Sequence, residues 1–397
     1  MGSRGVSAFI EGKEMLIIRC CRCGVSIGKK EDFRADVRES HTYCDLCLKE
    51  SVKEATPLSS KKGNNKNMAK YLVTGGAGFI GSNLVERLLE KGNAVRVIDN
   101  LSTGKIENIM PFLNDIEFIY GDIRNQAEAR DAAEGVDYVL HQAAIPSVQR
   151  SIDNPLESEE SNIKGTLNIL MAAREAGVKR VVYAASSSYY GNSNQLPKRE
   201  DMPPDTLSPY ALTKYVGESY CRLFHALYGL ETVAIRYFNV FGPKQDPSSP
   251  YSGVISKFIT SMLNGKPIVI YGDGQHSRDF TYIENIIDMN LRACTAPGVA
   301  GQVFNGGCGK RVTLNELVKA ICRAMNKNVM PIYADERAGD VKHSLADITK
   351  AEMMLGYKPL IGLEDGLLRT ITWYLKSSLA PEVGLGGEVK QQGAHNS

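Results

Sequence analysis

The sequence predicts an α/β fold with a doubly wound parallel sheet, followed by a smaller C-terminal α/β lobe and preceded by a small cysteine-bearing module. Three observations lead to this prediction. Short apolar runs alternate with helical patterns over residues 69–240, a glycine-rich turn at Gly75–Gly81 follows the first run, and the acidic Asp99 ends the second. Such alternation is typical of a parallel sheet covered by helices on both faces.

The strands are expected where apolar residues cluster between turn signals. Their expected bounds are Tyr71–Thr74, Ala94–Asp99, Ile116–Tyr120, Tyr138–His141, Arg180–Ala184 and Thr232–Tyr237. Between the fourth and fifth runs, the apolar residues of Asn162–Ala176 recur with the period of a helix. The order strand, helix, strand then predicts parallel pairing.

The glycine-rich turn is a candidate phosphate site. Gly75, Gly78 and Gly81 stand between an apolar run and an amphipathic stretch. Glycine allows the backbone to approach a pyrophosphate, and a helix N-terminus offers unpaired N–H groups to its charge. The spacing alone is weak, because such turns also serve plain chain reversal. The context of strand, turn and helix favours dinucleotide binding.

Two acidic residues follow strands at the same predicted edge. Asp99 occupies the position at which a Rossmann fold binds the adenosine ribose, and its charge would repel a 2′-phosphate, so NAD is favoured over NADP. Asp122 and Ile123 follow the third run, where the adenine is expected. A helix cap is the alternative interpretation of Asp122, and the two roles are compatible.

Composition limits the function classes. The 397 residues carry a formal net charge of +2 and are 43% hydrophobic, enough for one large core or two modest ones. The charge gives no reason to expect nucleic acid or an anionic membrane as partner. No apolar run approaches the roughly 20 residues that span a bilayer. The N-terminal segment Met15–Ile18 is too short for a signal-peptide core. We therefore expect a cytoplasmic protein.

The cysteines are unevenly distributed. Cys20-x-x-Cys23 and Cys44-x-x-Cys47 have the spacing of a structural zinc ribbon, which a segment this small would need in place of a core. Cys21 competes with Cys20, and His41 is an alternative ligand. A redox pair and ordinary free cysteines are the other interpretations. The remaining four cysteines are expected to be small core residues.

Candidate catalytic residues follow the fifth strand. Ser186, Ser187 and Ser188 end an apolar run, and Tyr210 and Lys214 are four residues apart, on one face of a helix. A nearby ammonium, helped by a cationic nicotinamide, would lower the pKa of the phenol. The phenolate would then act as a general base. A Tyr/Lys pair is common on helices, but its place behind the glycine turn makes it informative.

Residues 70–376 resemble the extended short-chain dehydrogenases/reductases, in particular the NAD-dependent sugar-nucleotide epimerase/dehydratase family. Beyond the motifs above, the resemblance rests on Arg236–Gly242, Ser277–Phe280, Arg337–Asp340 and Ala346–Ala351. It is closest to UDP-N-acetylglucosamine 4-epimerases, through Gln149–Ser151, Ala184–Ser188 and Lys342–Asp347. The cysteine module lies outside it.

The resemblance implies the reaction. In the 4,6-dehydratases of this family the serine segment carries an Asp–Glu pair, and in the uronic-acid decarboxylases a glutamate. This chain has Ser187, Ser188 and Tyr189 there, which leaves 4-epimerisation of a UDP-hexose through a transient 4-keto sugar. Ser344 would face the C2 substituent and leave room for an N-acetyl group. UDP-GlcNAc and UDP-GalNAc are therefore favoured, and UDP-Glc and UDP-Gal stay open. An ordinary exposed strand residue is the alternative for Ser344.

The resemblance also assigns residues. The expected catalytic residues are Ser186, Ser187, Ser188, Tyr210 and Lys214. The expected NAD contacts are Gly75, Gly78, Phe79, Ile80, Gly81, Asp99, Asn100, Ser102, Thr103, Gly104, Asp122, Ile123, Gln142, Ala143, Ala144, Asn162, Tyr210, Lys214 and Phe238. The expected substrate contacts are Ser147, Ser186, Tyr210, Asn239, Val254, Tyr271, Arg278, Arg337, Asp340 and Ser344. The cysteine spacing, and not the resemblance, gives the expected zinc ligands, Cys20, Cys23, Cys44 and Cys47.

The expected organisation has six parts. These are a disordered segment 1–14, a zinc-ribbon-like module 15–50, a linker 51–68, an NAD-binding domain 69–240, a nucleotide-sugar lobe 241–376 with some interleaving, and a disordered tail 377–397. The resemblance implies a homodimer formed by the helix that contains Tyr210 and the helix around Gly165–Ala176. The module is expected to dock a protein, contact a second copy or cap the domain. Two other functions stay open: UDP-glucuronate 4-epimerisation, or a non-catalytic NAD-binding regulator.

Overall fold

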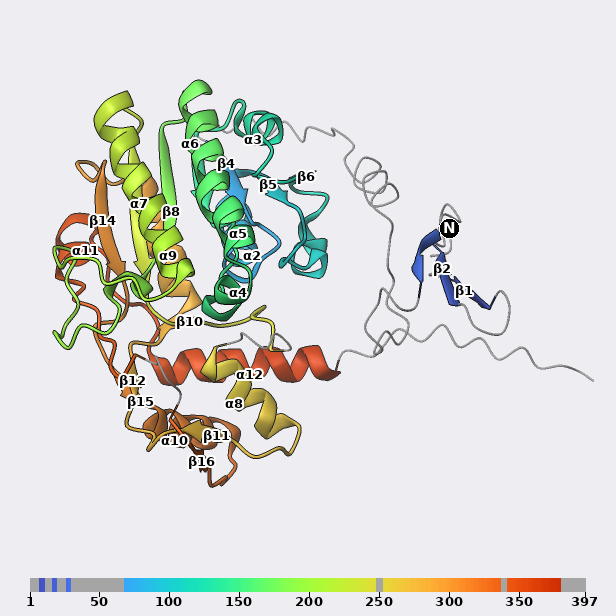
Figure 1. The fold of residues 1–397 in the computed structure, drawn as a ribbon, viewed down its shortest axis with the longest axis vertical. Helices are drawn as coiled ribbons and strands as arrows, with labels where there is room; N and C mark the ends of the chain where they lie inside the picture. Colours follow the sequence, from blue (N-terminus) through green and yellow to red (C-terminus); the bar gives the residue numbers. More distant parts are fainter. Residues whose placement is uncertain are drawn as a thin grey trace, which may run out of the picture. The chain divides into compact units, whose positions relative to one another are not determined.

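The computed structural model describes residues 68–247, 253–336 and 341–379, together with three short strands nearer the N-terminus (Figure 1). The chain divides into two compact units. The first comprises Met1–Tyr189, Pro204–Arg236 and Asn290–Phe304, and the second comprises Tyr190–Pro203, Tyr237–Met289 and Asn305–Ser397. The chain therefore passes between the units several times.

A seven-stranded sheet, in the order β14-β9-β8-β7-β4-β5-β6, confirms the predicted α/β fold. Its strands are β4 (Lys70–Thr74), β5 (Ala94–Asp99), β6 (Glu117–Tyr120), β7 (Tyr138–His141), β8 (Arg180–Ser186), β9 (Thr232–Tyr237) and β14 (Gln302–Gly306). The pairs from β6 through β5, β4 and β7 to β8 are parallel. Their carboxyl ends therefore meet at one edge, where ligands of doubly wound folds bind.

Helices α3 (Gln126–Ala133), α6 (Gly165–Glu175) and α7 (Pro209–Tyr228) pack together on one face of the sheet. Ala129, Ile169 and Phe224 from these helices join Leu72 and Val181 from the strands in one apolar cluster. Helix α2 (Phe79–Glu90) covers β4 and β5 with Leu84 and Leu88. Right-handed crossover connections place α2 on the opposite face.

Shorter helices surround this frame. They are η2 (Ile106–Asn108), η3 (Met110–Phe112), α4 (Val148–Asp153), α5 (Pro155–Glu159), the π-helical turn η4 (Glu160–Lys164) and the 3-10 turn η5 (Ser187–Tyr190). The expected helix at Asn162–Ala176 is thus α6 preceded by η4. A π-helical turn often marks a functional position.

The described residues of the second unit form short strand pairs and three long helices. Its elements are β10 (Val240–Phe241), α8 (Val254–Leu263), β11 (Val269–Tyr271), β12 (Ser277–Arg278), β13 (Thr281–Tyr282), α10 (Leu314–Met325), β15 (Val312–Thr313), β16 (Ile332–Ala334), α11 (Thr349–Leu355) and α12 (Leu363–Leu379). Helix α9 (Ile283–Thr295) is shared by the two units. Strand β10 pairs with β13, β11 with β16, and β12 with β15.

Three N-terminal strands, β1 (Ser7–Ile10), β2 (Leu16–Arg19) and β3 (Ser26–Lys29), form an antiparallel sheet. The four expected zinc ligands lie outside the part of the chain that the structure describes. Within that part, no helix is long and apolar enough to cross a bilayer.

A buried histidine joins β4, β7 and α6 below the carboxyl edge. The Thr166 hydroxyl donates to the Asn162 carbonyl (2.6 Å) and so accepts from His141 Nε2–H (3.0 Å). His141 Nδ1 is therefore unprotonated and accepts the Thr74 hydroxyl (2.7 Å), whose oxygen accepts Ala143 N–H (3.1 Å). This chain of hydrogen bonds needs a neutral imidazole.

Because His141 has to be neutral, the folded protein should lose stability on acidification. Burial, and next the nearby Lys214, lower the pKa of His141 from 6.5 to about 3. Between these values the unfolded chain binds a proton that the folded protein does not, so stability falls as the pH falls below 6.5. From pH 7 to pH 5 the loss is about 2 kcal/mol.

His141→Gln is therefore expected to be less stable at pH 7, but to lose about 2 kcal/mol less than the parent between pH 7 and pH 5. Urea unfolding at the two pH values measures this difference. Equal losses in the two proteins would contradict a neutral, buried His141.

Candidate active site

The first turn of the sheet has the geometry of an anion cradle. Gly75 follows β4 with φ of +65°, and a Cβ there would lie 2.7 Å from Ala143 Cα. A Cβ on Gly81 would lie 2.1 Å from the Gly75 carbonyl oxygen. Among the residues described in the structure, no side chain caps the N-terminus of α2. The cradle therefore fits a pyrophosphate, which would occupy the position that a capping side chain takes in other helices.

Asp99 supports the same turn. Its Oδ2 accepts Ala77 N–H (2.9 Å), and its Oδ1 accepts Leu101 N–H (2.8 Å). Burial raises the pKa of this carboxyl group, and the two backbone donors oppose the rise. The carboxylate is thereby fixed at the end of β5, next to the turn, as a ribose contact requires. Ser102, Thr103 and Gly104 follow in the next loop, where Ser102 N–H donates to Asn100 Oδ1 (3.0 Å).

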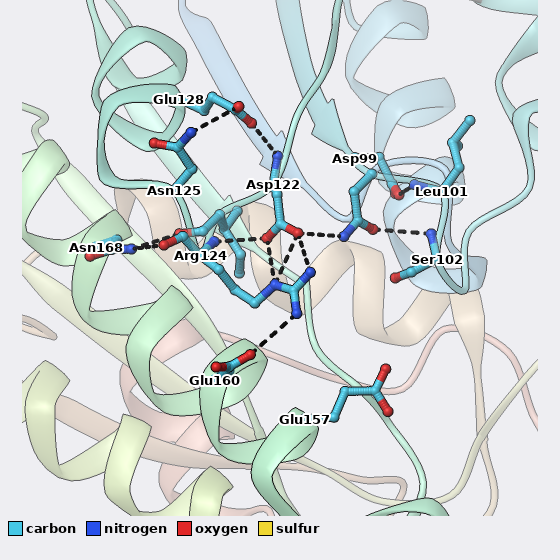
Figure 2. A network of polar contacts seen from close by, with 12 residues as sticks. Asp99, Leu101, Ser102, Asp122, Arg124, Asn125, Glu128, Glu157, Glu160 and Asn168 are labelled. Carbon is cyan, nitrogen blue, oxygen red and sulfur yellow. Dashed lines mark hydrogen bonds and ion pairs between the residues drawn. The ribbon is translucent and has the colours of Figure 1, made fainter. Parts of the chain in front are cut away.

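Asp122 is the centre of a polar network at the neighbouring strand end (Figure 2). It binds Arg124 Nη2 (2.6 Å) and Asn100 Nδ2 (3.0 Å), and its own N–H donates to Glu128 (2.6 Å). Burial alone would raise its pKa, but the Arg124 and Asn100 hydrogen bonds lower it. Asn125, not Asp122, caps α3, so the helix-cap interpretation of Asp122 is not what the structure shows. The carbonyl of Ile123 accepts from Asn168 (2.9 Å).

The serine segment and the tyrosine helix meet. Ser186 is the last residue of β8, and both the N–H (3.2 Å) and the hydroxyl (2.9 Å) of Ser188 donate to its Oγ. Tyr210 lies in the first turn of α7, where its N–H donates to Ser151 Oγ (3.0 Å). The hydroxyl group of Ser186 lies close enough to that of Tyr210 to favour its phenolate form. Ser187 follows Ser186 directly and is the first residue of η5.

Lys214 lies one turn further along α7 and is buried. Its ammonium donates to the Ala184 carbonyl (2.8 Å), and burial lowers its pKa to about 8. For Tyr210, burial raises the pKa, and the hydrogen bond with Ser186 only reduces the rise. The expected lowering of the phenol pKa is therefore not produced by the protein alone, because desolvation of the hydroxyl outweighs the single hydrogen bond.

Other expected cofactor contacts gather near β7. Gln142, Ala143 and Ala144 follow this strand directly. Asn162, in η4, accepts Ile145 N–H (2.8 Å) and donates to Thr213 (3.0 Å), so it connects the β7 end to α7. Ser147 caps α4 through Arg150 N–H. Phe238 is the one expected cofactor residue that belongs to the second unit, where it is buried.

The second unit contains a cavity of about 570 Å³. Four expected substrate residues line it: Asn239, Val254, Tyr271 and Arg278. Lys257, Phe258 and Lys266 also line it, and sequence analysis missed them. Lys257 stands three residues after Val254 on α8, a helical spacing that is the one signal available in the sequence.

Four further expected substrate residues, all of them described in the structure, are not in this lining: Ser147, Ser186, Tyr210 and Ser344. Ser344 is 8% exposed, and its N–H donates to the Ser277 carbonyl (3.0 Å). It is therefore not the exposed strand residue that sequence analysis kept as an alternative. Arg337 and Asp340 lie outside the described residues, and their contacts with the diphosphate and the uridine ribose stay predictions.

No metal site is found within the described ranges, where no three His, Cys, Asp or Glu side chains are grouped to hold an ion. The zinc prediction concerns Cys20, Cys23, Cys44 and Cys47, which lie outside those ranges. Cys221, Cys294, Cys308 and Cys322 are free thiols, the first two buried.

The sheet, the glycine cradle and the Ser–Tyr–Lys set define a Rossmann enzyme of the short-chain dehydrogenase type. Residues 71–307 match the NAD dependent epimerase/dehydratase family, and the chain belongs to this family.

Three relatives are informative. The UDP-glucose 4-epimerase of Mycolicibacterium smegmatis is 38% identical over 313 residues, 78% of this chain and 99% of that one. The UDP-glucuronate 4-epimerase of Thermodesulfobacterium geofontis is 38% identical over 317 residues, 77% of this chain and 96% of its own. The solved UDP-N-acetylglucosamine 4-epimerase of Methanobrevibacter ruminantium, in complex with UDP-N-acetylmuramic acid, is 40% identical, with a TM-score of 0.75 over 78% of this chain and 99% of that chain.

Gly81→Ala is expected to weaken NAD binding at least about tenfold, because the new methyl group has to push the Gly75 carbonyl away and widen the cradle. Cofactor released from the denatured protein and NAD titration of the stripped protein measure the effect. Gly362→Ala is the control, because nothing lies within 4 Å of a Cβ at that position. Unchanged binding in Gly81→Ala would contradict the assignment of the cradle.

Proposed function

We propose that this protein is an NAD-dependent 4-epimerase of UDP-hexoses, with UDP-GlcNAc and UDP-GalNAc as favoured substrates. One observation carries the proposal. Ser186, Tyr210 and Lys214 lie together beside an NAD cradle, while the turn Ser187–Tyr190 contains no carboxylate. Such a site has a proton acceptor for an alcohol but lacks the acid–base pair that dehydration needs.

NAD would be held by the glycine turn at its pyrophosphate, by Asp99 at the adenosine ribose and by Asp122 and Ile123 at the adenine edge. When bound, it supplies a hydride acceptor that returns the hydride within the same turnover, so the net redox change is zero. Lys214 would bind the nicotinamide ribose.

Tyr210 is the proposed base for the sugar 4-hydroxyl, with Ser186 hydrogen-bonded to the same oxygen. Because burial raises the pKa of Tyr210, the phenol is a poor base in the protein alone. Positive charge close to the phenol stabilises the phenolate. The base is thus expected to form only beside an oxidised cofactor, which is the state in which an alcohol has to lose its proton.

The cavity of the second unit is the proposed nucleotide site. Arg278, Lys257 and Lys266 bring positive charge to it, and Phe258 and Tyr271 bring aromatic surface. Cationic forks bind diphosphates and aromatic rings pack on bases, so this lining suits a nucleoside diphosphate. In this proposal residues 69–240 perform the proton chemistry and residues 241–376 bind the nucleotide.

The family resemblance and the relatives guide the choice of sugar. The relatives are named for UDP-glucose, UDP-glucuronate and UDP-N-acetylglucosamine. The small side chain of Ser344 supports the N-acetylated sugar, because a larger residue at the C2 substituent would exclude it. UDP-glucuronate is the second candidate, which the relative from T. geofontis supports.

A homodimer is also proposed. Leu212, Leu223 and Leu227 are exposed on α7, Leu227 at 67%. Ile152 and Leu156 are exposed on α4 and α5, which pack beside α7. A second copy would cover this apolar surface.

The purified protein should convert UDP-GlcNAc to UDP-GalNAc without added reductant, as chromatography of the products measures. Tyr210→Phe is expected to lose at least about a thousandfold in kcat and to keep its NAD, because only the proton acceptor is removed. Turnover of UDP-glucuronate alone would favour the second candidate. Bound NAD without turnover of UDP-GlcNAc, UDP-glucose or UDP-glucuronate would favour a non-catalytic regulator.

Ser344→Tyr should separate the sugars. The larger side chain is expected to lower kcat/KM for UDP-GlcNAc at least about a hundredfold, by steric exclusion, and to change that for UDP-Glc less than about threefold. Steady-state kinetics with both substrates test this. An equal loss of kcat/KM with both sugars would contradict the assignment of Ser344 to the C2 substituent of the sugar.

A further inference from the structure

A buried ion pair joins β9 to α7 beside the serine turn. Arg236 donates to Glu218 through Nε (2.8 Å) and Nη2 (2.7 Å), a two-point contact. The side chains are 2% and 3% exposed. Glu218 lies four residues after Lys214 on α7, and hence on the same helix face. The pair is therefore anchored on the face of α7 that carries the proposed site.

Arg236 has a second contact. Its guanidinium carbon lies 3.4 Å from the centre of the Tyr189 ring, on which it stacks. The same ring forms a T-shaped pair with Tyr215 of α7, with 5.5 Å between ring centres and 68° between their planes. The Tyr189 carbonyl also accepts Asp205 N–H (2.9 Å). The ring and the backbone of Tyr189 are thereby fixed from three directions.

Tyr189 lies in η5, the turn that begins with Ser187 directly after Ser186. Because η5 is a single short turn, the position of Tyr189 limits where Ser186 and Ser188 can lie. The Ser186 hydroxyl has to reach Tyr210, on the helix to which Glu218 and Tyr215 belong. Arg236 thus acts on both sides of that contact.

We propose that the Glu218–Arg236 pair is a positioning element of the reaction: through the stacked Tyr189 ring, it sets the serine turn against α7 and keeps the Ser186 hydroxyl next to Tyr210. Its kinetic consequences rest on the proposed epimerase function. Neither Glu218 nor Arg236 touches the reacting atoms in this proposal, so both are positioning residues.

Stability alone does not account for such a pair. The cost of removing two charges from water largely cancels their attraction, and apolar side chains of similar volume often serve a core as well or better. The planar guanidinium, by contrast, binds a carboxylate along two lines while its face stacks on a ring. A fixed angle between β9, η5 and α7 is what this arrangement adds.

The test removes the geometry and keeps the core filled. Single variants leave one buried charge unpaired and are expected to be strongly destabilised, so that a fall in kcat would not separate misfolding from a displaced site. The double variant Glu218→Leu with Arg236→Met avoids this. It is expected to fold and to retain NAD, with a KM within about threefold of the parent and a kcat lower by about 10- to 100-fold, because small misplacements of reacting groups have effects of this size.

Two controls accompany it. Tyr189→Phe keeps the stacked ring and should keep kcat within about threefold, whereas Tyr189→Leu should lose as much as the double variant. Arg180 and Glu231 form another ion pair of the first unit. They lie at the amino ends of β8 and β9, whereas Ser186 and Arg236 lie toward the carboxyl ends of these strands. Replacing Arg180 by Met and Glu231 by Leu should leave kcat unchanged.

A crystal structure of the Glu218→Leu, Arg236→Met protein provides a readout that does not depend on turnover. The proposal expects a displaced Tyr189 ring and a Ser186 hydroxyl that has moved away from Tyr210. An unchanged contact overturns it, whether or not the parent is an epimerase. If the parent is an epimerase and the double variant has the same kcat as the parent, the proposal is overturned as well. A parent that turns over no UDP-sugar refutes the proposed function, and the structural readout still decides the positioning role.

Discussion

The hydrogen-bond chain through His141 is the constraint on which the site depends. It connects the end of β4, the end of β7 and the helix that follows η4, through side chains that the apolar core surrounds. The glycine cradle begins at the residue after Thr74, and Ala143, which contacts the cradle, donates to Thr74 itself. One neutral imidazole therefore fixes the relative positions of the ends of β4 and β7, which flank the proposed pyrophosphate position.

Asn162 extends this constraint to α7. Its carbonyl accepts from Thr166, and its side chain holds Ile145 and Thr213. The amide thereby links the histidine chain to the helix that carries Tyr210 and Lys214. Polar groups buried in this way leave little freedom, since each loses its partner if any one moves. The proposed reaction centre thus rests on polar connections inside an otherwise apolar layer.

Local signals made most of the fold predictable. The bounds of β5, β7 and β9 agree with the predicted ones, because each is an apolar run between turn residues. The family motifs also located Ser186, Tyr210 and Lys214, which the structure brings together. Agreement was poorer where the backbone departs from a regular period, as at the π-helical turn η4, which a search for helical periodicity averages away.

Tertiary contacts set the limit of prediction. Arg236 was visible as part of a motif, but its partner lies on another element, and no spacing rule connects a strand residue to a helix residue 18 positions away. Lys257 and Lys266 become neighbours in a cavity only after the second unit has folded. Burial raises the pKa of Tyr210 in the protein alone, and this was not predictable, because desolvation depends on the atoms around the hydroxyl, which no linear pattern contains.

Asp99 has a consequence for protein engineering. A carboxylate at this position is the usual target when cofactor preference is to be changed from NAD to NADP, because its removal relieves repulsion of a 2′-phosphate. Here the same carboxylate holds the N–H groups of Ala77, inside the glycine turn, and Leu101, in the loop that follows. A neutral, shorter side chain would release both. Selectivity and the shape of the phosphate cradle are thus coupled in one residue, and a redesign has to rebuild the loop at Leu101 together with the charge.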